Sequence, residues 1–147
     1  MPVHSYRDLR VWQSGMRVAE LIHRLHRILP RSERRDVGDQ LRRASLSIPT
    51  NIAEGYGRDS RGDYVRFLKI ANGSLKEVET LLLLCARLGS LPEEATTEVV
   101  QECDQLGRML GTLLRKLATA PESSAWRTPN AQCPMPNASV DSPRPID

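Results

Sequence analysis

The sequence predicts an all-α protein: an up-and-down antiparallel four-helix bundle over residues 1–120, followed by a Pro-rich, disordered tail over residues 121–147. Apolar residues recur at spacings of three and four in four separate segments, the period of a helix with one buried face. Only six residues are aromatic, so Leu, Ile, Val and Ala must form the core, which favours helices over a β-sandwich. The tail holds six of the ten prolines and too little apolar surface to offset its ordering entropy.

The first predicted helix covers residues 5–29. It begins with a capping box formed by Ser5 and Asp8, and Pro30 ends it because proline cannot continue a helix. The polar segment 31–38 predicts a loop. The expected core face consists of Leu9, Trp12, Met16, Ala19 and Ile22, and a flanking apolar strip consists of Val11, Val18, Leu25 and Leu29.

The second predicted helix covers residues 39–54. Pro49 lies inside it, so we expect a kink there, because proline lacks an amide hydrogen and crowds the preceding turn. Gly55 and Gly57 predict a left-handed C-cap and a turn. The expected core residues are Leu41, Ala44, Ile48 and Ile52.

The third and fourth predicted helices carry the most regular apolar pattern of the chain. The third covers residues 60–88 with a capping box from Ser60 to Asp63, and the fourth begins with a capping box from Ser90 to Glu93, with Pro92 in its first turn. Alternating spacings of three and four are typical of bundle packing. The two seams are Tyr64, Leu68, Ala71, Leu75, Val78, Leu82 and Cys85, then Val99, Cys103, Leu106, Leu110, Leu113 and Leu117.

A second apolar strip on the third helix points to self-association. Ile70, Leu81, Leu84 and Leu88 lie about 100° from the main seam, so one bundle core cannot easily use both strips. Exposed apolar patches usually mark a partner surface. We therefore expect a homo-oligomer, with a monomer of wide core as the alternative.

The sequence contains no apolar run of the kind found in signal peptides or membrane spans. Its three cysteines form no CxxC pair, and we interpret them as small apolar side chains. We therefore expect a cytoplasmic protein without membrane association.

Arginines are concentrated in the first half of the chain. Residues 1–66 hold 13 Arg and 8 acidic residues, a net charge of +5, whereas residues 67–147 have a net charge of −2. Clustered cations are what phosphate contacts require, although a solvated face neutralised by nearby acids is the alternative. Arg10, Arg17, Arg24 and Arg31 recur every seven residues, Arg27 joins them, and Arg31, Arg34, Arg35, Arg42 and Arg43 crowd the start of the second helix.

Residues for catalysis cannot be assembled from the sequence. His23 and His26 could share a metal, but a pair without matched Cys or acidic ligands is a weak signal. The segment 55–58 resembles a phosphate loop only loosely, since neither a Lys-Ser/Thr pair nor a preceding strand accompanies it. We therefore predict no enzymatic activity, no metal and no cofactor.

Polar residues at the end of the second helix predict a buried structural network. Asn51 and Glu54 are placed to bond the unsatisfied groups at the helix end. Arg43 could pair with Glu54 or with Glu77 on the third helix.

The motifs around these residues resemble a known family. They are Leu9-x-Val-Trp12-Gln, then Gln40-Leu-Arg-Arg43-Ala with Ser47-Ile-Pro-x-Asn51-Ile-Ala-Glu54-Gly55-x-Gly57-Arg58, then Phe67-Leu with Ile-Ala71-x-Gly73-Ser74-Leu-x-Glu77. Over about residues 5–118 the chain is similar to the bacterial four-helix-bundle proteins encoded in intervening sequences of 23S ribosomal RNA, also called S23-like. The motif residues matched are Gln40, Arg43, Asn51, Glu54, Gly55, Arg58, Ser74 and Glu77.

The resemblance implies a bundle that assembles as a ring, a homopentamer. It also implies kinship with the accessory proteins of diversity-generating retroelements, basic pentamers that engage RNA and a reverse transcriptase. Two residues depart from the family pattern: Arg35 stands where an aromatic residue is usual, and Gly38 where a Ser or Thr cap is usual. Both are expected to weaken the anchoring of the second helix.

Two functional hypotheses follow. The first is a non-enzymatic oligomeric bundle that binds structured RNA or DNA through Arg10, Arg17, Arg24, Arg27, Arg42 and Arg43. The second is an adaptor that docks a larger enzyme such as a reverse transcriptase. We weigh a metal or nucleotide enzyme in the bundle core as a third and weaker hypothesis.

Overall fold

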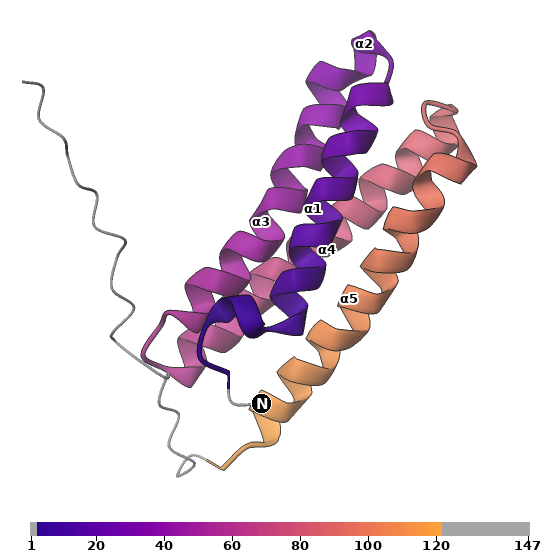
Figure 1. Ribbon diagram of the computed structural model, residues 1–147. Helices are drawn as coiled ribbons and strands as arrows, with labels where there is room; N and C mark the ends of the chain where they lie inside the picture. The colour runs from indigo at the N-terminus through magenta and orange to yellow at the C-terminus, as the bar shows by residue number, and fades with distance from the viewer. Residues whose placement is uncertain (1–2, 122–147) are drawn as a thin grey trace, which may run out of the picture.

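The computed structural model describes residues 3–121 and shows an all-helical up-and-down bundle (Figure 1). Each long helix packs against two neighbours: α1 and α4 both contact α3 and α5. The predicted fold class is thereby confirmed for the described residues, while the predicted disorder of the tail falls on residues outside them. The long helices are α1 (Arg10–Ile28), α3 (Asp39–Tyr56), α4 (Arg61–Leu88) and α5 (Glu93–Thr119).

The core contains the seams predicted for the last two helices. All seven seam residues of α4 are buried, and on α5 only Leu113 of the six is partly exposed. Of the second apolar strip on α4, Ile70, Leu84 and Leu88 are exposed, as the periodicity predicted, whereas Leu81 is partly buried against the core. Within the described residues, no helix is long and apolar enough to cross a membrane.

On α1 the predicted core face is rotated. The structure buries the strip that was expected to flank the core, namely Val11, Val18, Leu25 and Leu29, together with Ala19 and Ile22. Met16 is exposed, whereas Leu9 and Trp12 only pack at the edge of the core. Both strips are apolar, so spacing alone could not decide which one faces α3 and α5.

The beginning of the chain also differs from the prediction. The capping box of Ser5 and Asp8 forms, but it caps the short 3-10 helix Tyr6–Asp8. Leu9 is extended, with a ψ of 122°, and α1 starts after it without a side-chain cap. The capping pattern therefore predicted a turn correctly and the start of the long helix wrongly.

The predicted loop 31–38 is instead helical. It forms α2 (Arg31–Glu33) and a π-helical segment, Arg34–Gly38, that leads directly into α3. Arg34 explains the close packing of this segment, because its Nε donates to the carbonyl of Leu29 at 2.8 Å and its Nη2 to the carbonyl of Arg27 at 2.5 Å. These carbonyls close α1, where a helix end needs hydrogen-bond partners.

Gly38 fits this arrangement because a side chain would not. A Cβ placed there would lie 2.9 Å from Cδ2 of His26. Since the helical backbone continues upstream of α3, the missing Ser or Thr cap does not leave the start of that helix isolated. Gly38 thus packs closely on α1, and the weaker anchoring expected from the missing cap stays a prediction.

The remaining helix ends correct two predicted caps. Helix α3 continues through Pro49 and Gly55, and its C-cap Gly57 has a right-handed φ of −78°, so the predicted left-handed cap there was wrong. The left-handed glycine is Gly89, with φ 68°, and Ser90 donates its amide to the carbonyl of Cys85 at 2.9 Å. This is the usual left-handed end of a helix. Ser90 is therefore part of the end of α4 and does not cap α5, whose N-cap is Pro92 without a side-chain bond.

Candidate nucleic-acid interface

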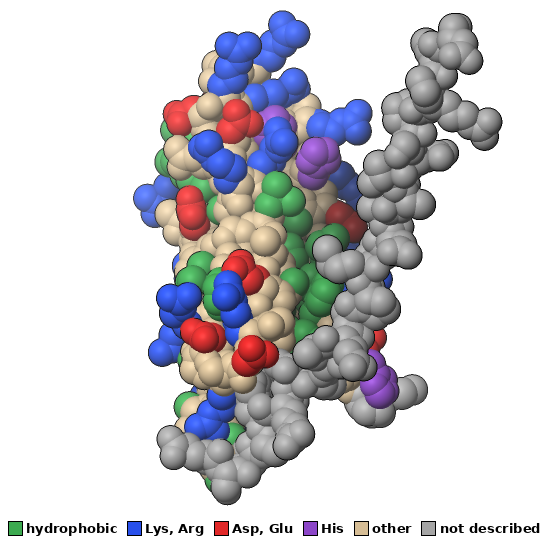
Figure 2. All heavy atoms as spheres, turned by 90° about the vertical axis from the view of Figure 1, so that its left-hand side faces the viewer, with side chains coloured by type: hydrophobic (Ala, Val, Ile, Leu, Met, Phe, Trp, Pro, Cys, Tyr) green, Lys and Arg blue, Asp and Glu red, His purple; other side chains and the backbone are tan. Residues whose placement is uncertain are grey.

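Basic residues gather at the end of the bundle where α1 ends and α3 begins. Residues 23–43 hold seven Arg and three acidic residues, a net charge of +4, so the other 126 residues together carry −1. Figure 2 shows Lys and Arg side chains crowded at this end of the molecule, beside histidine. We call residues 23–43 the basic end. An arginine cluster of this kind creates a positive potential that attracts phosphates.

Arg34 and Arg42 are held by the protein itself. Arg34 closes the end of α1, as described above. Arg42 is half-buried and lies 3.7 Å from Oδ1 of Asp39, which also contacts Nε2 of His26 at 3.2 Å. These contacts fix the framework from which the exposed arginines project. Beside the framework lies a hollow of about 650 Å³, lined by His26, Arg31, Ser32, Arg34, Arg35 and Asp39.

Three of the predicted nucleic-acid-binding residues lie exposed at the basic end. Arg24 and Arg27 project from the last turns of α1, and Arg43 from the first turn of α3. In the described part of the chain, none of the three side chains forms an ion pair. Their guanidinium groups are therefore available to a ligand. Arg42 lies beside them but is partly occupied by Asp39.

Arg17 is engaged by the neighbouring helix. Its Nη2 lies 2.7 Å from Glu98, and its Nε lies 3.0 Å from Glu102, which also accepts a hydrogen bond of 2.6 Å from Ser14. Sequence reasoning missed this cluster because the two carboxylates are more than 80 residues away along the chain. Arg10 lies about 21 Å from Arg24 along α1, from 1.5 Å per residue. Of the predicted arginine stripe on α1, Arg24 and Arg27 are therefore available to a ligand at the basic end. Arg17 is paired with carboxylates of α5, and Arg10 lies far from the basic end.

The polar motif of α3 and α4 does not form the predicted buried network. Glu54 pairs with Arg58 at 2.6 Å on the surface, and Arg43, Glu77 and Gln40 are exposed. Helix geometry explains the correction, since Arg43 and Glu54 are eleven residues apart, about 16 Å along α3. The pairing of Arg43 with either acid was therefore wrong.

A smaller polar network joins α3 to α4 in its place. Asn51 donates to the carbonyl and the hydroxyl of Ser47 at 2.7 and 2.9 Å, and Ser74 donates to the Ser47 hydroxyl at 2.8 Å. Ser47 stands in the sequence motif, but no role in the network was predicted for it from the sequence. Gly55 lies nearby with no room for a side chain, since a Cβ there would be 2.7 Å from Cβ of Phe67. The motif residues Asn51, Gly55 and Ser74 thus serve close helix packing.

The two buried cysteine thiols of the bundle are not activated as nucleophiles. Burial raises the pKa of the Cys103 thiol to about 12, and it also raises the pKa of the Cys85 thiol. Both thiols are buried and therefore remain protonated at neutral pH. Among residues 3–121, no three His, Cys, Asp or Glu side chains gather closely enough to hold a metal ion.

Comparisons with known proteins agree with this architecture. A family described as 23S rRNA-intervening sequence protein matches residues 7–112. A solved structure of a protein with unknown function, from the S23 ribosomal protein family of Bacteroides thetaiotaomicron VPI-5482, superposes with a TM-score of 0.66 at 24% sequence identity. The superposition covers 71% of this chain and 98% of that one, and it shows a shared fold.

Neither description names an enzymatic activity. A search among curated proteins gave no match. The family match spans well over half of the chain, from the start of the helical region almost to the end of α5. The chain therefore belongs to the family of 23S rRNA-intervening sequence proteins.

Proposed function

We propose that this protein is a non-enzymatic RNA-binding protein of the bacterial cytoplasm, and that its basic end is the main contact with structured RNA or another nucleic acid. The observation that carries the proposal is the net charge of +4 within residues 23–43, against −1 for the rest of the chain. Phosphate contacts from Arg and Lys supply most of the sequence-independent affinity for nucleic acids. Arginine also suits phosphate because its planar fork can donate two hydrogen bonds at once.

The six proposed contact residues contribute unequally. Arg24, Arg27 and Arg43 are exposed and free of ion pairs within the described chain, so they make the principal contacts. Arg42 contributes less because Asp39 lies beside it. Arg17 must first leave two carboxylates, and Arg10 reaches only a ligand that extends along α1. The expected order of effect is therefore the three basic-end residues first, then Arg42, then Arg17 and Arg10.

Self-association would strengthen the positive electrostatic potential of the basic end by bringing several copies of it together. The family resemblance leads us to propose a homo-oligomer, a pentameric ring, in which several basic ends face one ligand. The exposed apolar side chains of Ile70, Leu84 and Leu88 on α4 support an interface there. Repeated basic ends would increase affinity through effective concentration, without any new type of contact.

The test is a binding titration of the full chain with a labelled RNA hairpin at several salt concentrations. The variant combines Arg24→Glu with Arg27→Glu. The matched control combines Arg66→Glu with Lys69→Glu, two exposed residues near the start of α4, at the opposite end of the bundle. Both variants change the net charge by the same amount. A difference in RNA affinity between them therefore shows that the position of the charges matters, and not only their sum.

We expect the basic-end variant to lose about tenfold or more in affinity for the hairpin, because it loses two phosphate contacts. The control variant should lose much less, because its two residues lie outside the proposed contact surface. The slope of log affinity against log salt should also become shallower by about 2 in the basic-end variant. Helicity measured by circular dichroism should stay unchanged in both. Equal losses in the two variants would reduce the effect to net charge and reject the assigned surface.

A second candidate function is that of an adaptor docking a larger enzyme such as a reverse transcriptase. A hollow of about 580 Å³ between α4 and α5, with Leu83 and Val100 exposed on its walls, favours it. A pull-down of such an enzyme that survives nuclease treatment, and that is lost on Leu83→Glu, would favour the adaptor over the RNA-binding protein.

A further inference from the structure

We propose that the trough between the start of α1 and the second half of α5 is a docking site for an acidic amphipathic helix of a partner protein. This surface lies at the end of the bundle opposite the basic end, and it forms no part of the proposed RNA contact apart from Arg10 and Arg17. The principal RNA contacts, Arg24, Arg27 and Arg43, lie outside it, so the two proposals can be tested separately.

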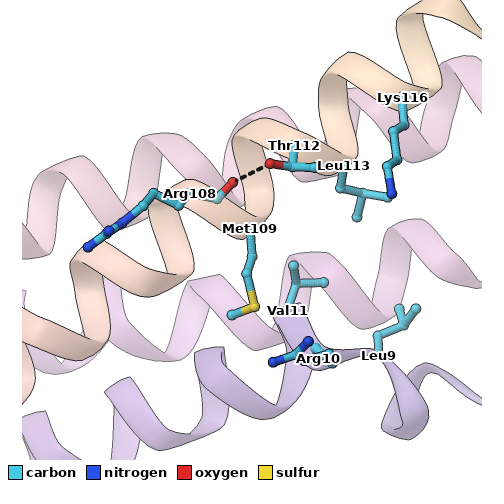
Figure 3. A pocket seen from close by; sticks show the side chains of 8 residues that line it. All are labelled: Leu9, Arg10, Val11, Arg108, Met109, Thr112, Leu113 and Lys116. Atoms are coloured by element: carbon cyan, nitrogen blue, oxygen red, sulfur yellow. Dashed lines mark hydrogen bonds between the residues drawn. The ribbon is translucent and has the colours of Figure 1, made fainter.

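The floor of the trough is apolar. Leu9 and Val11 come from the start of α1, and Met109 and Leu113 come from α5 (Figure 3). Together with their neighbours they line a hollow of about 410 Å³. Met109 and Leu113 are only half-buried, so this apolar surface is left partly open to water. Burying it against a partner would be favourable by about 25 cal/mol per Å² of apolar surface.

The rim of the trough is cationic. Arg10, Arg108 and Lys116 line the same hollow, and none of its eight lining residues is acidic. All three side chains are exposed, and within residues 3–121 none of them forms an ion pair. Arg108 only donates to the carbonyl of Asp104 on its own helix, at 3.3 Å. An apolar floor under three available cations is complementary to an apolar helix face flanked by carboxylates.

The length of the trough favours a helix over a small ligand. A second hollow of about 350 Å³ continues it along α1 and α5 and shares Arg10 and Met109 with the first. Its other lining side chains are polar, and its one carboxylate, Glu102, is bonded by Ser14 and Arg17. The two hollows follow α5 from Glu102 to Lys116, fourteen residue steps or about 21 Å at 1.5 Å per residue. That length accommodates about four turns of a docked helix, a common way of recognising peptides in grooves.

The two helices that form the trough are held in place on either side of it. At one end, within the second hollow, Glu102 is bonded by Ser14 at 2.6 Å and by Arg17 at 3.0 Å, which ties α5 to α1. Beyond the other end, Nη1 of Arg61 donates to the carbonyl of Ala120 at 2.6 Å, which ties the end of α5 to α4. The trough is therefore pre-formed, so a partner would not have to spend free energy on opening it.

Single-stranded nucleic acid fits this site less well than a peptide. Single-stranded bases stack on aromatic side chains, and none of the residues lining the two hollows is aromatic. The acidic helix satisfies both the floor and the rim. The other occupants, a nucleic acid and a second copy of this chain, are outcomes of the experiment below.

The experiment measures fluorescence anisotropy of a labelled, helix-forming peptide with Leu on one face and Glu beside it, titrated with the full chain. A second peptide has Lys in place of Glu. The variants are Arg108→Glu combined with Lys116→Glu, and separately Met109→Gln, which keeps the side-chain length but removes the apolar contact. The matched control is again Arg66→Glu combined with Lys69→Glu.

We expect the Glu peptide to bind at least about tenfold more tightly than the Lys peptide, a difference of about 1.4 kcal/mol. The charge-reversal variant and Met109→Gln should each weaken binding of the Glu peptide by about tenfold, as central contacts of an interface do. The control variant should change it by less than about twofold. Equal affinity for the two peptides, or equal losses in variant and control, would overturn the proposal.

Two further measurements identify the competing occupants. If sedimentation of the peptide-free protein shows that the charge-reversal variant changes its oligomeric state, the trough is an interface between copies of this chain and the proposal is wrong. If the RNA hairpin displaces the Glu peptide and Arg108→Glu with Lys116→Glu abolishes RNA binding, the trough is a nucleic-acid site and the proposal is equally wrong. Loss of RNA binding on changing Arg24 and Arg27 leaves the peptide result untouched, so the two proposals fail separately.

Discussion

Replacing Gly55 by alanine tests whether α3 and α4 pack as closely as the structure indicates. A Cβ on Gly55 would lie 2.7 Å from Cβ of Phe67 and 3.1 Å from Cδ2 of Tyr64. Carbon atoms in contact are normally about 3.5–4.0 Å apart, so the two helices would have to separate by roughly 1 Å. Cβ of Phe67 is fixed by the backbone and cannot rotate away. Relief must therefore come from moving a helix.

The control is Gly73→Ala in the middle of α4, where a Cβ would meet nothing within 4 Å. Alanine is favoured over glycine inside a helix by about 0.5–1 kcal/mol, and both substitutions gain this term. Only Gly55→Ala adds the overpacking cost of about 1–3 kcal/mol. The difference between the two variants therefore isolates the helix contact, and it should be about 1–3 kcal/mol.

Urea denaturation followed by far-ultraviolet circular dichroism measures both free energies of unfolding. Protein concentration must be equal in all samples, because self-association would add to the apparent stability. We expect Gly73→Ala to unfold at higher urea than the wild type and Gly55→Ala at lower urea. Equal or greater stability of Gly55→Ala relative to Gly73→Ala would refute the close approach of α3 and α4.

Two further predictions concern polar and buried groups. Glu102→Ala should lower the free energy of unfolding by about 1–3 kcal/mol, because the Glu102 side chain is only 14% exposed and bonds to Ser14 and Arg17. The control Glu98→Ala removes a carboxylate that is 58% exposed, so it should lower the free energy of unfolding by less than about 1 kcal/mol. Similar losses for the two variants in thermal denaturation would contradict this ranking. The pKa of Cys103 is raised from 9.0 to about 12 by burial, so the unfolded chain releases this proton first and stability should fall as the pH rises from 9 towards 12. Between pH 8 and 10.5, in reductant, the wild type should lose about 2 kcal/mol more than Cys103→Ala, and parallel losses in both would show that the thiol is not responsible.

The sequence predicted the bundle well because its main determinant is local. The spacing of Leu75, Val78 and Leu82 identifies a buried helix face without knowledge of the neighbouring helices, and the structure buries all three. The same logic failed on α1, where two apolar strips compete. The choice between Met16 and Val18 depends on where α3 and α5 lie, and that information is not contained in the periodicity of α1 itself.

The ends of helices were harder to predict than their faces. Segment 31–38 has the polarity of a loop, but the guanidinium of Arg34 binds the last carbonyls of α1 and stabilises a helical path instead. A capping box is likewise a local pattern that two kinds of helix can share, so Ser5 caps a short 3-10 turn. Composition alone cannot distinguish an arginine that binds the backbone from one that projects into solvent.

This distinction decides how the candidate interface should be understood. Seven arginines in residues 23–43 suggest a uniform basic surface, yet the structure uses Arg34 as a helix cap and holds Arg42 beside Asp39. Further along α1, Arg17 serves as a link to α5. Charge counted along the chain therefore overestimates the charge available to a ligand, because part of it already stabilises the fold. Arg24, Arg27 and Arg43 remain exposed, as do Arg31 and Arg35. Replacing Arg24, Arg27 or Arg43 should affect binding without affecting helicity, and for that reason these residues separate the function of the basic end from its structure.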